Sequence, residues 1–250
     1  MFDMEIVFDS DDVVVVNKPA GITAHADGVN DEETVVDWFL SVHPNAKGVG
    51  DDRIGNDGKD LERSGVVHRL DKATSGVMIL AKTQPAFEHL KTQFQDRIVK
   101  KEYRAFVYGR MHEKWGTIER PIGRSSKDFR LRSAQRGAKG TIRDAVTDWE
   151  LIGQGDYKDE PFAYLKLKPK TGRMHQLRVH LKAIDRPIVG DELYAGKRLE
   201  TSSNLDLNRL ALHAHILELI LPNGEDQRFV APIPEVFDIA ADSLHTSDDD

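Results

Sequence analysis

The run HRLDKATSG, residues 68–76, is the densest cluster of polar side chains outside the acidic loops of this 250-residue chain. It lies between the apolar segments 66–67 and 77–81, which have the character of strands. A loop presented by a rigid sheet is where functional side chains are commonly found. The residues alone leave two interpretations open. One is a turn stabilised by its own polar side chains, and the other is a site in which the carboxylate of Asp71 is a nucleophile beside arginines.

Hydrophobic patterns on either side of this run predict an α+β protein. Strand-like patterns occur at 5–8, 13–17, 77–81, 100–109, 162–167, 209–221 and 228–230, and residues 116–149 are β-rich. Helical spacing predicts helices at 34–43, 85–97 and 175–183. Hairpin signals favour a central, mostly antiparallel mixed β-sheet flanked by helices and loops.

No repeat and no shift in composition marks a domain boundary, so we expect a single domain over residues 1–250. Residues 45–62 are rich in Gly, Asp, Asn and Lys and predict a mobile loop. Residues 235–250 are predicted to be an acidic C-terminal end with a frayed tail.

Charge is unevenly distributed along the chain. The formal net charge is −7, which as a bulk value argues against a nucleic-acid-binding protein. Residues 63–198, however, carry a surplus of 13 positive charges, whereas the segments on either side are acidic. We therefore expect a polyanion to bind the middle of the chain, and the acidic ends to lie away from it.

The sequence excludes several kinds of chemistry. It has no cysteine, which removes disulfides, thiolate metal sites and cysteine nucleophiles. Metal-ligand motifs and glycine-rich phosphate loops are absent. A triad of Ser75, His68 and Asp71 is conceivable, but no GxSxG motif presents the serine. Because no apolar run could span a membrane and no signal peptide is recognisable, we expect a soluble cytoplasmic protein.

A second polar cluster, TGRMHQLRVHL at residues 171–181, lies at a predicted helix start. His175, Arg178 and Lys182 are three or four residues apart and share one helix face, which could approach an anion. A solvated basic face is the alternative that the spacing leaves open. Residues 97–143 hold 14 Lys and Arg against 4 acidic residues. This segment is suited to contacting phosphates, or to lying in water as a basic surface.

Five segments together resemble the RluA family of RNA pseudouridine synthases. They follow the family's order: VVVVNKPAGITAH (13–25), HRLDKATSG (68–76), KKEYRAFVYG (100–109), KTGRMHQLRVHL (170–181) and RLALHA (209–214). The resemblance implies the pseudouridine synthase fold, with its core at about residues 5–232. It also implies an isomerase that breaks the N-glycosidic bond of uridine, turns the uracil and rejoins it through C5, without cofactor or metal.

The resemblance implies a role for each matching residue. Asp71 would be the nucleophile, or the base in a glycal route. Arg173 would pair with this carboxylate, and Tyr103 would stack on uracil with its hydroxyl near C5. Arg69 would fill the space left by a flipped uridine. Further RNA contacts are expected from basic or imidazole side chains in the same segments and in the basic stretch: His68, Lys72, Arg178, Arg130 and Arg132.

The chain also departs from its larger relatives. Many of them begin with an S4-like RNA-binding domain, whereas here the first predicted strand starts near Glu5, so that domain is expected to be missing. The implied partner is structured RNA, either ribosomal RNA, transfer RNA or both, bound by a monomer. The alternative is a non-catalytic RNA-binding or RNA-folding factor on the same scaffold. The presence of Asp71, Tyr103 and Arg173 argues against that alternative.

Overall fold

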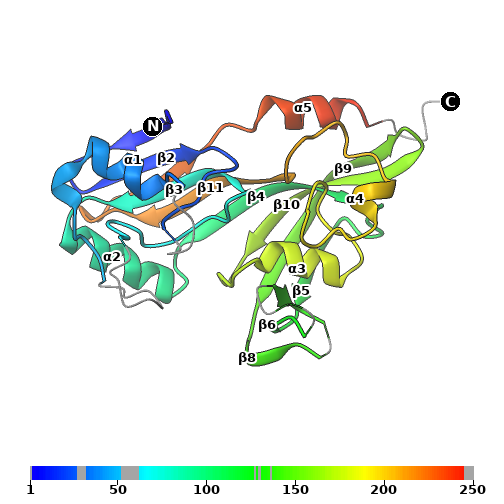
Figure 1. Cartoon of the computed structure of the whole chain (residues 1–250), viewed down its shortest axis with the longest axis horizontal. Helices are drawn as coiled ribbons and strands as arrows, with labels where there is room; N and C mark the ends of the chain where they lie inside the picture. Colours follow the sequence, from blue (N-terminus) through cyan, green and yellow to red (C-terminus); the bar gives the residue numbers. More distant parts are fainter. Residues whose placement is uncertain are drawn as a thin grey trace. The chain divides into compact units, whose positions relative to one another are not determined.

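The computed structural model describes residues 2–26, 32–51, 62–126, 128, 131–135 and 137–244 (Figure 1). The chain divides into two compact units. The first comprises Met1–Lys100 and Ala214–Pro232, and the second comprises Lys101–His213 and Ile233–Asp250. The expectation of a single domain stays a prediction. No helix in the described ranges is long and apolar enough to cross a membrane.

The first unit is built on strands that are hydrogen-bonded in the order β1, β2, β3 and β11, with β12 paired to β11. The strands are β1 (Glu5–Asp9), β2 (Val13–Lys18), β3 (Ser75–Ala81), β11 (Leu212–Ile220) and β12 (Asp226–Val230). The helices are α1 (Val35–Val42), the 3-10 helix η1 (Pro44–Ala46) and α2 (Gln84–Gln95), and α1 and α2 flank the strands in Figure 1. Strands β2 and β3 pair antiparallel and are almost entirely buried. Their continuous apolar runs are typical of strands covered on both faces.

Helices α1 and α2 begin at threonine caps. The hydroxyl of Thr34 accepts the backbone N–H of Asp37, whose carboxylate accepts the backbone N–H of Thr34. This reciprocal pair is a capping box. Thr83 caps α2, where Pro85 occupies the first turn. The predicted helices 34–43 and 85–97 are therefore confirmed, with small shifts at their ends.

The second unit contains two antiparallel sheets. The larger has the strand order β4 (Lys100–Tyr108), β10 (Glu160–Pro169), β9 (Val146–Tyr157) and β5 (Trp115–Glu119). The small sheet has the order β7 (Arg132–Ser133), β6 (Ile122–Arg124) and β8 (Lys139–Arg143). The helices are α3 (Gln176–Ala183), α4 (Arg198–Thr201) and α5 (Glu235–Asp242). The β-rich segment predicted at 116–149 thus resolves into separate strands.

Two segments differ from what the sequence patterns suggest. The composition of residues 235–250 predicts only an acidic end, whereas residues 235–242 form helix α5. Its buried face carries Phe237 and Ala240, so apolar spacing outweighs acidic composition here. The predicted loop 45–62 overlaps η1 at its start, and residues 52–61 lie outside the described residues, as does the tail from 245 to 250.

Candidate active site

Asp71 lies on the loop that leads into β3 of the first unit. The loop is closed by its own backbone, because the N–H of Thr74 donates to the carbonyl of Asp71 at 3.0 Å. Leu70, Thr74 and Ser75 are buried on either side, whereas Asp71 is partly exposed. The fold therefore holds the backbone around Asp71 while leaving the residue at the surface.

Lys18, which the sequence patterns did not single out, fastens this loop to the NKPAG turn. The residue is 0% exposed, and its ammonium group donates to three backbone carbonyls, one of which is that of Lys72. The N–H of Gly21 donates to the same Lys72 carbonyl at 2.8 Å. A buried ammonium group is tolerated only where acceptors replace water. Lys18 and Gly21 together thus tie the turn to the loop that precedes β3.

The imidazole ring of His68 packs within the first unit and is hydrogen-bonded there. Its Nε2 accepts the backbone N–H of Ile79 at 3.1 Å, and the ring stacks on Phe94 with centroids 4.6 Å apart. This bond occupies the lone pair that a catalytic base would use at Nε2, and Ser75 is buried in β3. The geometry does not support a serine triad. A contact of His68 with RNA stays a prediction.

Arg69 and Lys72 are both exposed, and each has a partner in the first unit. Nη1 of Arg69 lies 3.0 Å from Nε2 of His25, a buried ring whose Nδ1 faces the backbone carbonyl of the next residue. That ring accepts from Arg69 as a neutral imidazole. The ammonium group of Lys72 pairs with Glu32 at 2.5 Å. Glu32 belongs to the acidic first segment, so the expectation that this segment lies away from the site is wrong at this point.

Tyr103 lies in β4 of the second unit, opposite Leu167 of β10, and is partly buried. Lys101, two residues earlier, lies on the same face of the strand. Burial lowers the pKa of the Lys101 ammonium group from its ordinary value. The face of β4 that carries Tyr103 therefore also carries a partly desolvated cation.

Arg173 lies in the loop before α3, and the side chain of Gln176 shapes that loop. Oε1 of Gln176 accepts the backbone N–H of Arg173 at 3.0 Å and the hydroxyl of Thr171 at 2.6 Å. Its Nε2 donates to the carbonyl of Val146 at 3.0 Å. Nε of Arg173 donates to the carbonyl of Asp144 at 3.1 Å. These bonds hold both the backbone and the guanidinium group of Arg173.

Arg178, which the sequence predicts to contact RNA, is buried, and that contact stays a prediction. Its Nε and Nη2 donate to the two carboxylate oxygens of Asp191 at 2.8 and 2.7 Å, and the residue is 5% exposed. His175, Arg178 and Lys182 do share a face, as their spacing predicts. That face meets Tyr194, whose hydroxyl lies 2.7 Å from Nδ1 of His175 and whose ring lies under the two cations. The partner that all three side chains share is therefore an aromatic ring, and Arg178 in addition pairs with the Asp191 carboxylate.

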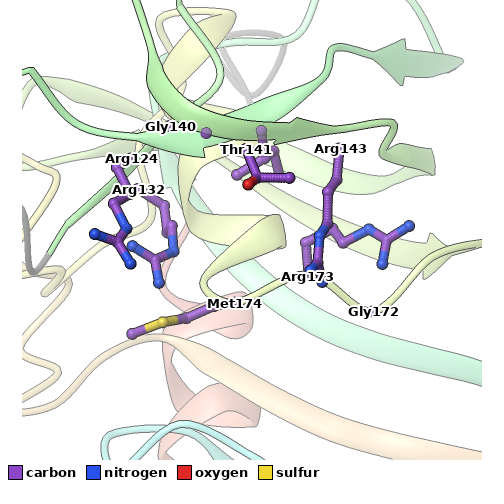
Figure 2. A pocket seen from close by; sticks show the side chains of 10 residues that line it. Arg124, Arg132, Gly140, Thr141, Arg143, Gly172, Arg173 and Met174 are labelled. Carbon is purple, nitrogen blue, oxygen red and sulfur yellow. The ribbon is translucent and has the colours of Figure 1, made fainter.

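A pocket of about 520 Å³ in the second unit brings Arg173 together with Arg132, which was predicted to bind RNA (Figure 2). Four arginines, three glycines, a threonine and two apolar residues line it: Ile122, Gly123, Arg124, Arg132, Gly140, Thr141, Arg143, Gly172, Arg173 and Met174. None of these residues is acidic. Arg130, also predicted to bind RNA, lies outside the described residues. The pocket is therefore suited to an anion.

The three candidate catalytic residues are divided between the units, with Asp71 in the first and Tyr103 and Arg173 in the second. Arg69 and Lys72 share the loop of Asp71, and Arg132 shares a pocket with Arg173. Within the part of the chain that the structure describes, no three His, Asp or Glu side chains cluster as metal ligands would. The expectation that the reaction needs no cofactor stays a prediction.

Comparison with known proteins identifies the family. The family model for RNA pseudouridylate synthase matches residues 12–183. Ribosomal large subunit pseudouridine synthase D of Borreliella burgdorferi is 36% identical over 248 residues, which cover 98% of this chain and 69% of that protein. An uncharacterized RNA pseudouridine synthase of Synechocystis is 36% identical over 237 residues, covering 94% of this chain and 67% of that protein.

Solved structures agree with this assignment. The structure of human RNA pseudouridylate synthase domain containing 1 superimposes with a TM-score of 0.74 at 27% identity, covering 98% of this chain and 89% of that one. Human RNA pseudouridylate synthase domain containing 4 gives a TM-score of 0.68 at 25% identity, with 96% and 92% coverage. The expected pseudouridine synthase fold is confirmed. The chain therefore belongs to the RluA family of RNA pseudouridine synthases, which are isomerases.

Proposed function

We propose that this protein converts uridine to pseudouridine in structured RNA, with Asp71 as the nucleophile or base. One observation carries the proposal. In a chain of this family, Asp71 lies within HRLDKATSG on a surface loop whose backbone is fastened by Lys18 and Thr74. A nucleophile that is already positioned in this way loses little entropy when the substrate binds.

The proposed reaction starts with cleavage of the bond between C1′ and N1 of uridine. The carboxylate of Asp71 either attacks C1′ or takes a ribose proton to give a glycal. The detached uracil then turns, and C5 bonds to C1′. In the nucleophile route this displaces the Asp71 carboxylate from C1′, and in the glycal route Asp71 returns the proton that it took from the ribose. C5 loses its proton and N1 gains one, so the product is an isomer of the substrate and no atom is added or lost.

The remaining roles follow the family pattern. Arg173 pairs with the Asp71 carboxylate through its guanidinium fork, and Tyr103 stacks on uracil with its hydroxyl near C5. Arg69 fills the space that the flipped uridine leaves, and its contact with His25 supports this role because it holds the guanidinium group in place. Lys72, His68, Arg132 and Arg130 contact the RNA.

Ribosomal RNA is the first candidate substrate. Several relatives that share about a third of their residues with this chain bear the name ribosomal large subunit pseudouridine synthase D, including those of Borreliella burgdorferi and Vibrio parahaemolyticus. Transfer RNA is the second candidate. The enzyme would act as a monomer in the cytoplasm.

Release of tritium tests the reaction. RNA labelled with tritium at uridine C5 should release the label to water when the purified protein is added. Asp71→Asn should abolish release and leave RNA binding nearly unchanged, since the basic surface supplies the phosphate contacts. Asp11→Asn, at an exposed position of the same unit, removes the same charge and should keep full activity. Tight RNA binding without release from any RNA fraction would instead indicate the non-catalytic factor.

Mapping of pseudouridine identifies the substrate. Total RNA from cells with and without this gene is sequenced for pseudouridine, and the positions that disappear are the targets. Loss confined to large-subunit ribosomal RNA is the expected result. Loss confined to transfer RNA would contradict the preference for ribosomal RNA while leaving the isomerase activity in place.

A further inference from the structure

Three cationic residues form a row across the small sheet of the second unit. Arg124 of β6 is paired with Arg132 of β7 on one side and with Lys139 of β8 on the other. Like charges directly opposite each other destabilise a sheet. Among the described residues, neither arginine has an ion-pair partner, and the side chain of Arg132 reaches only the carbonyl of Leu131, at 3.5 Å. Repulsion along this row therefore destabilises the small sheet, and a bound anion would reduce that repulsion.

Arg143 and Arg173 bring the number of guanidinium groups in the adjoining pocket to four. In Figure 2, Arg124 and Arg132 are at one end of the pocket, and Arg143 and Arg173 are at the other, with Thr141 between the two pairs. The pocket volume of about 520 Å³ falls within the range of small-molecule sites, and it exceeds what one phosphate group requires. The charge and size together suit more than one phosphate.

The pocket is held by a core behind the small sheet. Ile122, Ala134, Ala145, Val179 and Tyr194 form a buried cluster that joins the small sheet to α3. In addition, the backbone N–H of Arg132 donates to the Tyr194 hydroxyl at 3.0 Å. Glycine at position 123 is required by close packing, since a Cβ there would lie 2.9 Å from the carbonyl oxygen of Lys139. The arginines therefore project from a fixed frame.

We propose that this pocket binds two or more successive phosphates of the RNA strand that carries the target uridine, an inference that rests on the proposed function. Guanidinium forks match phosphate oxygens through paired hydrogen bonds, which is why arginine is favoured at such sites. Each phosphodiester carries one negative charge. Because Arg173 is assigned to the Asp71 carboxylate, Arg124 and Arg132 match one phosphate at one end of the pocket and Arg143 matches the next one at the other end (Figure 2). Met174 is 43% exposed at the pocket wall and offers a thioether surface to a base or sugar.

Free nucleotides and inorganic phosphate present the same phosphate chemistry as an RNA strand. They are shorter than a strand, and only a strand places successive phosphates at both ends of the pocket at once. UMP and inorganic phosphate are therefore the competing probes. Displacement of RNA by UMP at micromolar concentration would overturn the assignment to an RNA strand.

The salt dependence of RNA binding tests the proposal. A fluorescently labelled oligouridylate is titrated with the Asp71→Asn protein, which binds without turnover, at a series of salt concentrations. The magnitude of the negative slope of log Kobs against log salt should fall by about 0.7 for each phosphate that the protein no longer neutralises, and so by about 0.7 in the double variant Arg124→Gln/Arg132→Gln, which removes both arginines at one end of the pocket (Figure 2). Arg228→Gln is the control, because Arg228 is exposed and already paired with Glu218, and its slope should stay at the starting value.

Thermal stability separates weaker binding from failure to fold. Because Arg124 faces two like charges, Arg124→Gln should raise the thermal midpoint of the free protein while weakening RNA binding. A double variant that binds with unchanged affinity and slope would overturn the proposal. Absence of tritium release from the wild-type protein would instead remove the proposed function, and the slope comparison would still decide whether the pocket binds phosphate.

Discussion

The side chain of Gln176 accepts the backbone N–H of Arg173 at 3.0 Å, from a position that is 4% exposed. The same amide donates to the carbonyl of Val146 and to the hydroxyl of Thr147 in β9. One buried side chain thus connects the loop of a proposed active-site arginine to the larger sheet of the second unit. A residue that acts in this way positions another and need not touch the substrate.

Gln176→Ala should therefore lower kcat more than it changes KM. Small displacements of a positioning group cost up to about 100-fold in rate, so we expect a fall in kcat of about 10- to 100-fold in the tritium-release assay. Gln93→Ala is the matched control. Gln93 is also 4% exposed and bridges both backbone groups of Ile220 in the first unit, so its loss should destabilise the protein with little effect on kcat. Equal losses of kcat in the two variants would contradict the positioning role.

Gly76 cannot be replaced by alanine without disturbing the start of β3. Its φ is +118°, and a Cβ there would lie 2.1 Å from the carbonyl oxygen of Ala214. Gly76→Ala should lower the free energy of unfolding by about 3 kcal/mol or more, measured by urea denaturation, because strain and a backbone clash add together. Gly224→Ala isolates the strain, since φ is +88° there and no atom lies within 4 Å. Its cost should be about 1–2 kcal/mol.

The strands and the Asp71 loop could be predicted from the sequence because their signals are local. β2 and β3 are buried on both faces and therefore appear as unbroken apolar runs. Helix α5 also carries a local signal in Phe237 and Ala240, but the acidic composition around these two residues obscures their spacing. The sequence of that segment contained the information needed to predict a helix.

Other features could not be predicted because they depend on partners that are distant in sequence. A lysine is usually exposed, and Lys18 is buried only because backbone carbonyls from two turns surround its ammonium group. Helix spacing placed Arg178 on the correct face, but it could not show that Asp191 lies beneath it. The row of Arg132, Arg124 and Lys139 exists only through the register of three short strands.

Acidification should destabilise the protein through two histidines. Burial lowers the pKa of His180, and burial together with the nearby ammonium group of Lys82 lowers the pKa of His43. The unfolded chain, with a histidine pKa of about 6.5, then binds more protons than the folded chain. Stability from these groups is fully present above about pH 6.5 and is lost as the pH falls from there towards the lowered folded values, by at most about 1.4 kcal/mol per pH unit for each histidine.

Thermal midpoints measured between about pH 7 and about pH 5 check this pH dependence. His180 lies between the Thr147 hydroxyl and the Arg120 carbonyl, each 2.9 Å from a ring nitrogen, so His180→Gln should lower stability near pH 7 but flatten the decline below pH 6.5. The exposed substitution His112→Gln should keep the wild-type curve. A decline in His180→Gln as steep as in the wild type would assign the acid sensitivity to other groups.

Removing one partner of the buried ion pair of Arg178 and Asp191 should lower the free energy of unfolding strongly, whereas replacing both partners should lower it little. Arg178→Met leaves the Asp191 carboxylate at 0% exposure, where the backbone N–H groups of residues 193 and 194 are the donors that stay in place. Removing one partner of a buried pair costs about 3–5 kcal/mol. In Arg178→Met/Asp191→Asn the amide oxygen still accepts those N–H groups and no charge is buried, so urea denaturation should show most of the stability recovered.

The same double variant tests where Arg178 acts. If its guanidinium group only supports the fold, the repaired protein should bind oligouridylate with the wild-type affinity and salt slope, because every phosphate-binding cation is still present. Arg110→Met, which breaks the more exposed pair with Asp156, serves as the stability control and should cost at most about 1 kcal/mol. If the magnitude of the salt slope is about 0.7 smaller in the repaired double variant than in the wild type, Arg178 contacts a phosphate, which would contradict its assignment to the core.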